Sequence, residues 1–235
     1  MSYKLRFLIP LLLLSSLLVN AQQDSPKPDN EVQKPTGVTT IEDNSDVRIL
    51  RFDVPADAIK LISTSGRDAV IVGIADMSLT SGSSKSETLK AGEVRFLERE
   101  KKYSAAGLAI VIELKQHREP PVKYCEPLSK CTHQNFMAAG QEVSSTTTVF
   151  TNGFTTAMRY DVVSHGSLDS SYYSAKGKDS VIFVPLTDVK VQFDEVEEQL
   201  KLGQAYFSNA SAISVEGGEQ GAKWVVVRLN KPKAS

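Results

Sequence analysis

The chain has 235 residues, 41% of them hydrophobic and 23% charged, which is enough for one large domain or two small domains with packed cores. The formal net charge at pH 7 is −1, and Lys and Arg are scattered along the sequence rather than clustered. This balance lacks the basic surface by which proteins bind nucleic acid or an anionic membrane, so neither is expected as a partner.

The first 21 residues are predicted to be a cleaved signal peptide. Lys4 and Arg6 form a basic start, an apolar run follows over residues 7–19, and Ala21 ends a small-residue cleavage site. A transmembrane anchor is the alternative, but the run is shorter than the ~20 residues that span a bilayer. We therefore expect a secreted or bacterial periplasmic protein, cut after Ala21, with no membrane span left after cleavage.

Residues 22–38 are predicted to be a disordered linker. Gln, Pro, Asp and Lys dominate this stretch, and it has almost no apolar side chains. Such a segment buries too little surface to offset the entropy lost on ordering.

An internal repeat occupies most of the remaining chain. The octet "LKAGEVRF" at Leu89–Phe96 returns as "LKLGQAYF" at Leu200–Phe207, and Thr39–Val54 aligns without a gap on Thr147–Val162. Two further blocks match in the same order, which chance similarity of strands does not explain. The repeat predicts two copies of one structural unit, over 39–115 and 147–235.

Each copy reads as a series of short β-strands. Leu50, Phe52 and Val54 alternate with Arg51 and Asp53, the pattern of a half-buried strand. Turn-forming residues separate such runs, and no stretch has a helical period. The spacing is typical of an all-β sandwich or jelly-roll barrel.

The repeated blocks of the first copy resemble a known family. The stretch from "VRILRFDV" through "LKAGEVRFLE" to "IVIELK" is similar to a small cupin, a double-stranded β-helix barrel, and the octet resembles the second half-motif of that family. The second copy shows the same features. The resemblance covers 39–115 and 147–231 and implies a degenerate bicupin, with two tandem barrels packed together.

The resemblance fails at the metal ligands of the family. Cupins that bind metal use a His-x-His pair, an acid and a further His. The three histidines here, His117, His133 and His165, are nowhere two apart. The resemblance places Tyr172 and Ser174 where the His pair would stand, and Tyr103 near the third ligand position of the first copy. We expect neither a metal site nor another cofactor.

The segment 116–146 is predicted to connect the two barrels. Its Cys125 and Cys131 enclose five residues, and in an oxidising compartment they are expected to form a disulfide. The alternative, a metal site completed by His133, offers only three ligands and matches no closed zinc pattern.

The candidate ligand-binding residues lie mainly in the second copy. Alternation sends Tyr172, Ser174 and Lys176 to one strand face, where they could hold a small polar ligand or a carbohydrate, and Tyr103 joins them as the matching candidate in the first copy. The alternative is that these side chains only fill the barrel. Trp224 could stack on a sugar, although a packing role is favoured.

No nucleophile–base set or phosphate-binding glycine loop is present, so catalytic residues are unknown. We expect a non-catalytic module for binding or structure. The alternative is a cupin-type enzyme, either a metal-independent isomerase or epimerase or one with a non-standard metal site. Association into a homodimer is left open.

Overall fold

The computed structural model describes residues 37–62, 66–84, 86–116, 123–124, 131, 133–138, 141–151, 155–168, 179–210 and 212–229. All regular structure within these ranges is β-strand, as the sequence predicts. No helix in the described ranges is long and apolar enough to cross a membrane. The predicted signal peptide, 1–21, lies outside them, so its cleavage after Ala21 stays a prediction.

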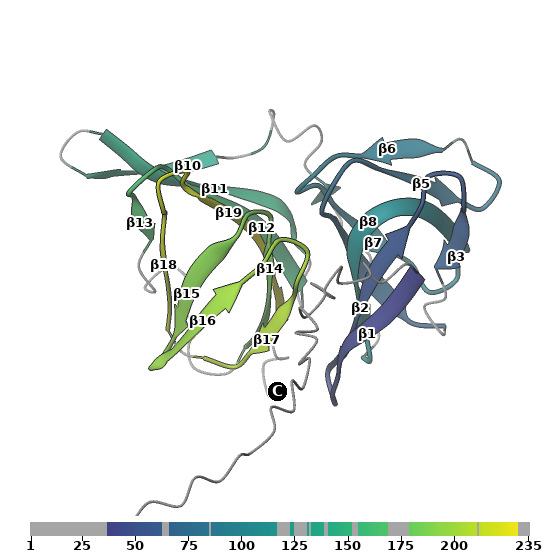
Figure 1. Ribbon diagram of the computed structural model, residues 1–235. Coiled ribbons are helices and arrows are strands. Elements are labelled where there is room, and N and C mark those ends of the chain that lie inside the picture. Colours follow the sequence, from purple (N-terminus) through teal and green to yellow (C-terminus); the bar gives the residue numbers. More distant parts are fainter. Residues whose placement is uncertain are drawn as a thin grey trace, which may run out of the picture. The chain divides into compact units, whose positions relative to one another are not determined.

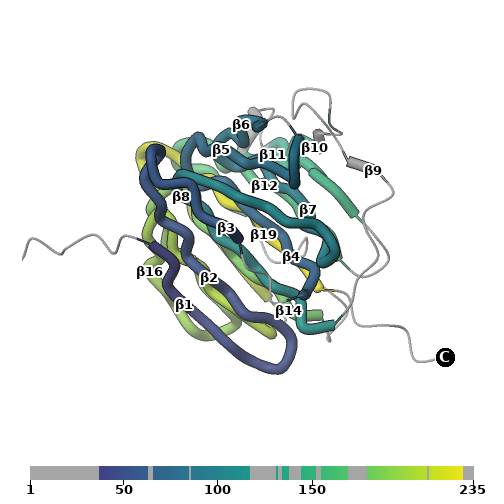
Figure 2. Tube along the Cα trace, turned by 90° about the vertical axis from the view of Figure 1, so that its right-hand side faces the viewer, coloured from purple at the N-terminus to yellow at the C-terminus, as the bar shows by residue number. Residues whose placement is uncertain are grey.

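The N-terminal half forms one eight-stranded sheet that curls into a barrel (purple to teal in Figure 1). Its central order is β1-β2-β8-β4-β7, and these strands run side by side in Figure 2; β3 and β5 pair with another part of β8, and β6 pairs with β5. The strands are β1 (Gly37–Asp43), β2 (Val47–Val54), β3 (Lys60–Ile62), β4 (Asp68–Gly73), β5 (Met77–Ser81), β6 (Glu87–Leu89), β7 (Val94–Leu97) and β8 (Tyr103–Leu114).

The C-terminal half consists of two sheets (teal through green to yellow in Figure 1). A seven-stranded sheet has the order β10-β11-β12-β19-β14-β17, with β9 on β11, and a four-stranded sheet has the order β13-β18-β15-β16. The strands are β9 (Lys123–Tyr124), β10 (His133–Ala138), β11 (Gln141–Thr151), β12 (Thr155–Val162), β13 (Ser167–Leu168), β14 (Ser180–Pro185), β15 (Val189–Phe193), β16 (Val196–Leu200), β17 (Tyr206–Ser208), β18 (Ile213–Glu216) and β19 (Ala222–Leu229).

Gly107 is the corner at which the N-terminal barrel closes. The residues of β8 before Gly107 pair with β3 and β5, whereas those after it pair with β2 and β4. The φ of Gly107 is +126°, a value that L side chains rarely adopt. Glycine therefore lets one long strand serve both walls of the barrel.

Strand alternation separates the cores. In β8, Ala109 and Val111 face a cluster inside the N-terminal barrel, whereas Ile110 and Ile112 face a second cluster. That second cluster also contains residues of the C-terminal half, among them Val225 and Val227 of β19. A third cluster fills the C-terminal barrel. Both faces of β8 are thus buried, which explains its nearly continuous apolar sequence.

The repeated octet has the same local structure in both halves. Lys90 pairs with Asp76 at 2.7 Å, and Lys201 pairs with Asp188 at 2.8 Å. The side chains of Glu93 and Gln204, one in each copy, accept a hydrogen bond from the backbone N–H of the repeated lysine. In both halves the octet therefore forms a turn in which a side chain accepts the hydrogen bond of the lysine N–H.

Each turn also receives an arginine from the other half. Arg51 of β2 donates to the carbonyl of Gly203 at 3.1 Å, and Arg159 of β12 donates to the carbonyl of Ala91 at 3.5 Å. Both arginines are ion-paired two residues along the same strand, at 3.3 Å with Asp53 and 3.2 Å with Asp161. The repeated Arg-x-Asp motif thus has a structural role between the halves.

The strands extend beyond two expected boundaries. Gly37 and Val38, assigned to the linker from sequence, belong to β1, where Val38 pairs with Phe52. Part of the 116–146 connector also forms strand, because β10 and the start of β11 pair with each other and extend the C-terminal sheet. Backbone pairing needs no apolar pattern, which is why the sequence did not indicate these strands.

Candidate functional site

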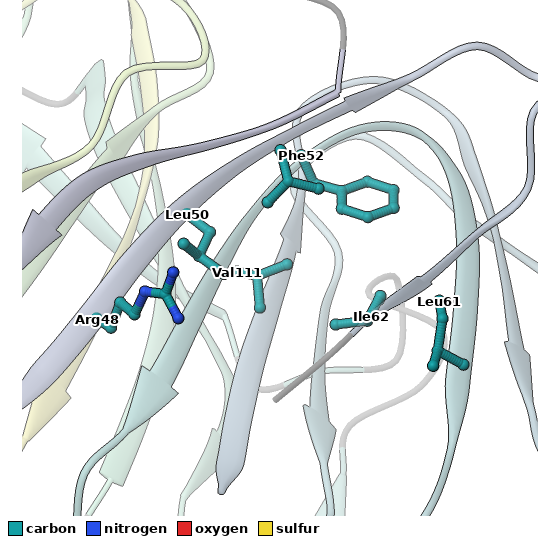
Figure 3. A pocket seen from close by; sticks show the side chains of 7 residues that line it. Arg48, Leu50, Phe52, Leu61, Ile62 and Val111 are labelled. Atoms are coloured by element: carbon teal, nitrogen blue, oxygen red, sulfur yellow. The ribbon is translucent and has the colours of Figure 1, made fainter. Parts of the chain in front are cut away.

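A cavity of about 280 Å³ lies in the N-terminal barrel. Figure 3 shows its lining, which comes from β1, β2, β3 and β8. Six of the lining side chains are apolar and one is charged: Val38, Leu50, Phe52, Leu61, Ile62 and Val111, with Arg48. Small-molecule sites have this character, namely apolar walls with a few polar groups that fix orientation.

Arg48 belongs to the cavity because of its register in β2. Arg48, Leu50 and Phe52 are alternate residues, and they stand opposite Glu113, Val111 and Ala109 of β8. Since alternate residues share a face, the Arg48 side chain lies on the same side of the sheet as the apolar lining. Figure 3 shows its guanidinium near Leu50 and Val111.

Glu113 of β8 is a buried acid that stands opposite Arg48 and does not itself line the cavity. Its side chain is 0% exposed, and neither carboxylate oxygen accepts a hydrogen bond from the residues described. The nearest cations are Arg48 Nη1 and Arg67 Nη1, each 3.8 Å from Oε2, which is too far for a hydrogen bond. Burial raises the pKa of the Glu113 carboxyl, while the two arginines oppose the shift.

The guanidinium of Arg48 is only loosely paired. Its Nη2 donates to Thr40 Oγ1 at 3.4 Å, and its Nε, 4.0 Å from Asp43, is buried without a hydrogen-bond partner in the described part of the chain. Lys115 Nζ forms an ion pair with Asp43 Oδ1 at 2.5 Å. The cluster therefore has three cations, Arg48, Arg67 and Lys115, against the acids Asp43 and Glu113.

The C-terminal barrel is filled where it is described. Trp224 is fully buried and stacks on Tyr160, with ring centroids 5.4 Å apart, and on Phe183 at 5.5 Å. Phe193 packs edge-on against Phe183 at 5.9 Å. This confirms the packing role favoured for Trp224 and makes a sugar-stacking role wrong.

Of the four residues predicted to bind a ligand, the structure describes Tyr103. Tyr172, Ser174 and Lys176 lie outside the described residues, so their role stays a prediction. Tyr103 is buried in the core of the N-terminal barrel, opposite Ile62, and its hydroxyl accepts a hydrogen bond from the Glu98 N–H at 3.2 Å. Tyr103 does not line the cavity, and its position indicates packing.

The predicted disulfide also involves a residue outside the described ranges. Cys125 lies outside the described residues, and Cys131 is buried. No free cysteine is found in the described part of the chain. The pairing of Cys125 with Cys131 stays a prediction.

The donors expected of a metal-binding cupin are not gathered in the described part of the chain. No group of three or more His, Cys, Asp or Glu residues stands together there. Of the cavity-lining residues only Arg48 is charged, and it is a cation. His165 is exposed in a turn with φ +56°. The residues present at the cavity therefore do not fit a metal ion, and we derive no chemistry through one.

Sequence reasoning missed Arg48 and Glu113. The signal was available, because each is a charged residue in an otherwise apolar segment, "VRIL" and "IVIEL". Strand alternation places Arg48 on the face of Leu50 and Phe52, which was already assigned to the interior.

Comparison with known proteins gives the fold. A scan of protein-family models and a search of curated proteins found no match. Solved structures do match. An IolB-like protein from Salmonella typhimurium has a TM-score of 0.61 at 8% identity, over 86% of this chain and 92% of its own.

Two further structures have a TM-score of 0.57 at 10% identity. A putative glyoxylate-induced protein from Pseudomonas aeruginosa matches over 84% of this chain and 82% of its own, and an oxalate decarboxylase from Lactobacillus farciminis over 83% and 82%. The chain is thus an all-β protein of the jelly-roll class. More narrowly, it has the cupin fold, as the sequence resemblance predicted. At these identities the likeness concerns the fold and not an activity.

Proposed function

We propose that this protein is a non-catalytic, cupin-fold binding protein that holds a small molecule in its N-terminal barrel. The observation that carries the proposal is the 280 Å³ cavity, walled by apolar side chains and reached by one arginine. Its volume is close to the lower end of the range for ligand sites, about 300–1,000 Å³. The ligand is therefore small.

The contrast between the halves supports this assignment. Stacked aromatic rings fill the core in the described part of the C-terminal half, whereas Val38 and Leu61 line the N-terminal cavity and remain 48% and 62% exposed. Exposed apolar side chains beside an apolar cavity are typical of a binding-site rim. The apolar walls favour a less polar ligand than the carbohydrate considered from sequence.

We extend the proposal to export, with cleavage after Ala21 and a Cys125–Cys131 disulfide. The basic and apolar N-terminal residues and the cysteine spacing support it. Intact-mass analysis of protein recovered from cell fractions tests both points. A mature chain beginning at Gln22 and lighter by two hydrogens is the expected result, and a full-length cytoplasmic chain with free thiols contradicts it.

The binding site is tested by blocking its rim. Leu61→Trp places a large ring at the mouth of the cavity, and Ile59→Trp is the matched control, since Ile59 is 66% exposed and does not line the cavity. We expect small apolar molecules to raise the Tm of the wild type and of Ile59→Trp, and not that of Leu61→Trp. Equal shifts in all three proteins would place binding elsewhere, and no shift in any of them would remove the proposed function.

A further inference from the structure

The cavity has a charged end and an apolar body. Arg48 is its one charged lining residue, and Leu50, Phe52 and Val111 continue the surface along the same face. A ligand complementary to this surface has one polar head and an apolar tail.

The charge at that end selects the sign of the head. Arg48 has no carboxylate within hydrogen-bond distance in the described residues, since Glu113 is 3.8 Å away and Asp43 4.0 Å away. Its Nε is buried and unpartnered there. A buried donor left unpaired destabilises the protein, so a ligand that accepts its hydrogen bond gains affinity. Arginine also presents two parallel N–H donors that match a carboxylate.

The neighbouring groups do not cancel this positive charge. Arg67 adds a second cation near Glu113, and Lys115 is engaged by Asp43. Burial favours the neutral form of Glu113, since it raises the pKa of that carboxyl. Even with both carboxyls ionised, the cluster keeps three cations, Arg48, Arg67 and Lys115, against the two acids Asp43 and Glu113.

We propose that the N-terminal barrel binds a small amphipathic carboxylic acid, with its carboxylate on the guanidinium of Arg48 and its apolar tail along Leu50, Phe52 and Val111. This inference rests on the proposed function, because it assigns a ligand class to the same cavity.

Calorimetric titration of the full mature chain tests the head group. The probes are octanoate, 1-octanol and octylammonium, which share one tail and differ in charge. We expect octanoate to bind at least tenfold more tightly than octanol, and octylammonium to bind weakest. Arg48→Gln should remove most of the preference for octanoate over octanol, whereas Arg99→Gln, an arginine outside the cavity, should leave it unchanged.

A series of straight-chain acids from four to twelve carbons tests the tail. Each methylene moved into an apolar site strengthens binding about fourfold, so the affinity should rise by that factor per carbon and level off once the cavity is full. A series without a chain-length dependence overturns the placement of the tail.

The outcomes separate this inference from the proposed function. If octanol binds as tightly as octanoate and Arg48→Gln changes nothing, the cavity is a binding site but the anionic ligand class is wrong. Preferential binding of octylammonium also overturns the class, because it shows that the charged end of the cavity does not favour an anion. If none of the three probes binds the wild type, both the ligand class and the proposed cavity function fail.

Discussion

Replacing Gly107 with alanine should destabilise the N-terminal barrel strongly. An alanine there must adopt φ near +126°, and its Cβ would lie 2.4 Å from Met77 Cβ and 2.9 Å from Met77 Cα. Neither atom is the movable end of a side chain, so β5 or β8 has to shift. The strained φ costs about 1–3 kcal/mol, and the overlap costs about 1–3 kcal/mol more.

The expected loss for Gly107→Ala is therefore about 4 kcal/mol, a large part of the ~5–15 kcal/mol that stabilises a typical protein. Gly82→Ala is the matched control. Gly82 also has a positive φ, +56°, but no atom lies within 4 Å of an added Cβ. Its loss should be about 1 kcal/mol, which is the conformational cost alone.

Urea denaturation followed by far-UV circular dichroism measures both variants against the wild type. Trp224, the single tryptophan, lies in the C-terminal barrel, so its fluorescence shows whether that half unfolds together with the rest. Equal losses for the two variants would refute the reasoning, because Gly107→Ala adds both a more strained φ, +126° against +56°, and the overlap with Met77 at the barrel corner.

Four other substitutions are expected to have measurable effects. Glu113→Gln should become more stable relative to the wild type as the pH rises above the usual range of a Glu pKa, by up to about 1.4 kcal/mol per pH unit. The reason is that burial raises the pKa of Glu113, so that ionisation of this acid destabilises the folded wild type. Denaturation between pH 4 and 8 checks this, and a difference in stability that is constant over that range contradicts it. Arg51→Met and Arg159→Met should each lose about 1–2 kcal/mol through the missing hydrogen bond to the opposite turn, whereas Lys190→Met, on an exposed ion pair, should match the wild type in the same urea titration. Trp224→Ala should cost about 3–5 kcal/mol in calorimetric unfolding, and a loss below 1 kcal/mol would show that the stacked rings do not form the core.

The strand pattern was the most predictable part of the fold. Alternation in "VRILRFDV" gave the interior face of β2, and the repeated octet indicated a structural unit that occurs twice. The likeness to solved cupin-fold structures confirms the barrel type inferred from these blocks. Local periodicity is sufficient for strands such as β2 and β8, because each of them buries at least one face, whereas β1 is mostly exposed.

The partners of the octet could not be read from its sequence. Gly92 and Gly203 were interpretable as turn glycines, but the arginines beside them come from residues more than 60 positions away and from the other half. Such pairings depend on how two sheets face each other, which no local pattern specifies.

The position of the candidate site differs from the sequence prediction for a similar reason. The resemblance directed attention to Tyr103 and Tyr172, because the family places metal ligands there. The cavity instead lies beside Arg48, where Val38 of β1 and Leu61 of β3 meet residues of β2 and β8. A void depends on the summed volumes of side chains from four strands, and a single-strand analysis does not include that sum.

The reciprocal arginine contacts between the two halves of this chain have the pattern of contacts across the interface of a two-fold symmetric dimer. In a symmetric dimer, residue i of one subunit meets residue j of the other, and the reverse contact follows. Arg51 on the Gly203 turn and Arg159 on the Ala91 turn reproduce that exchange, so each half already has its counterpart by covalent linkage. Two chains would therefore have to associate through a different surface. One such surface is the outer backbone edge of β1, because β1 pairs only with β2 among the described strands.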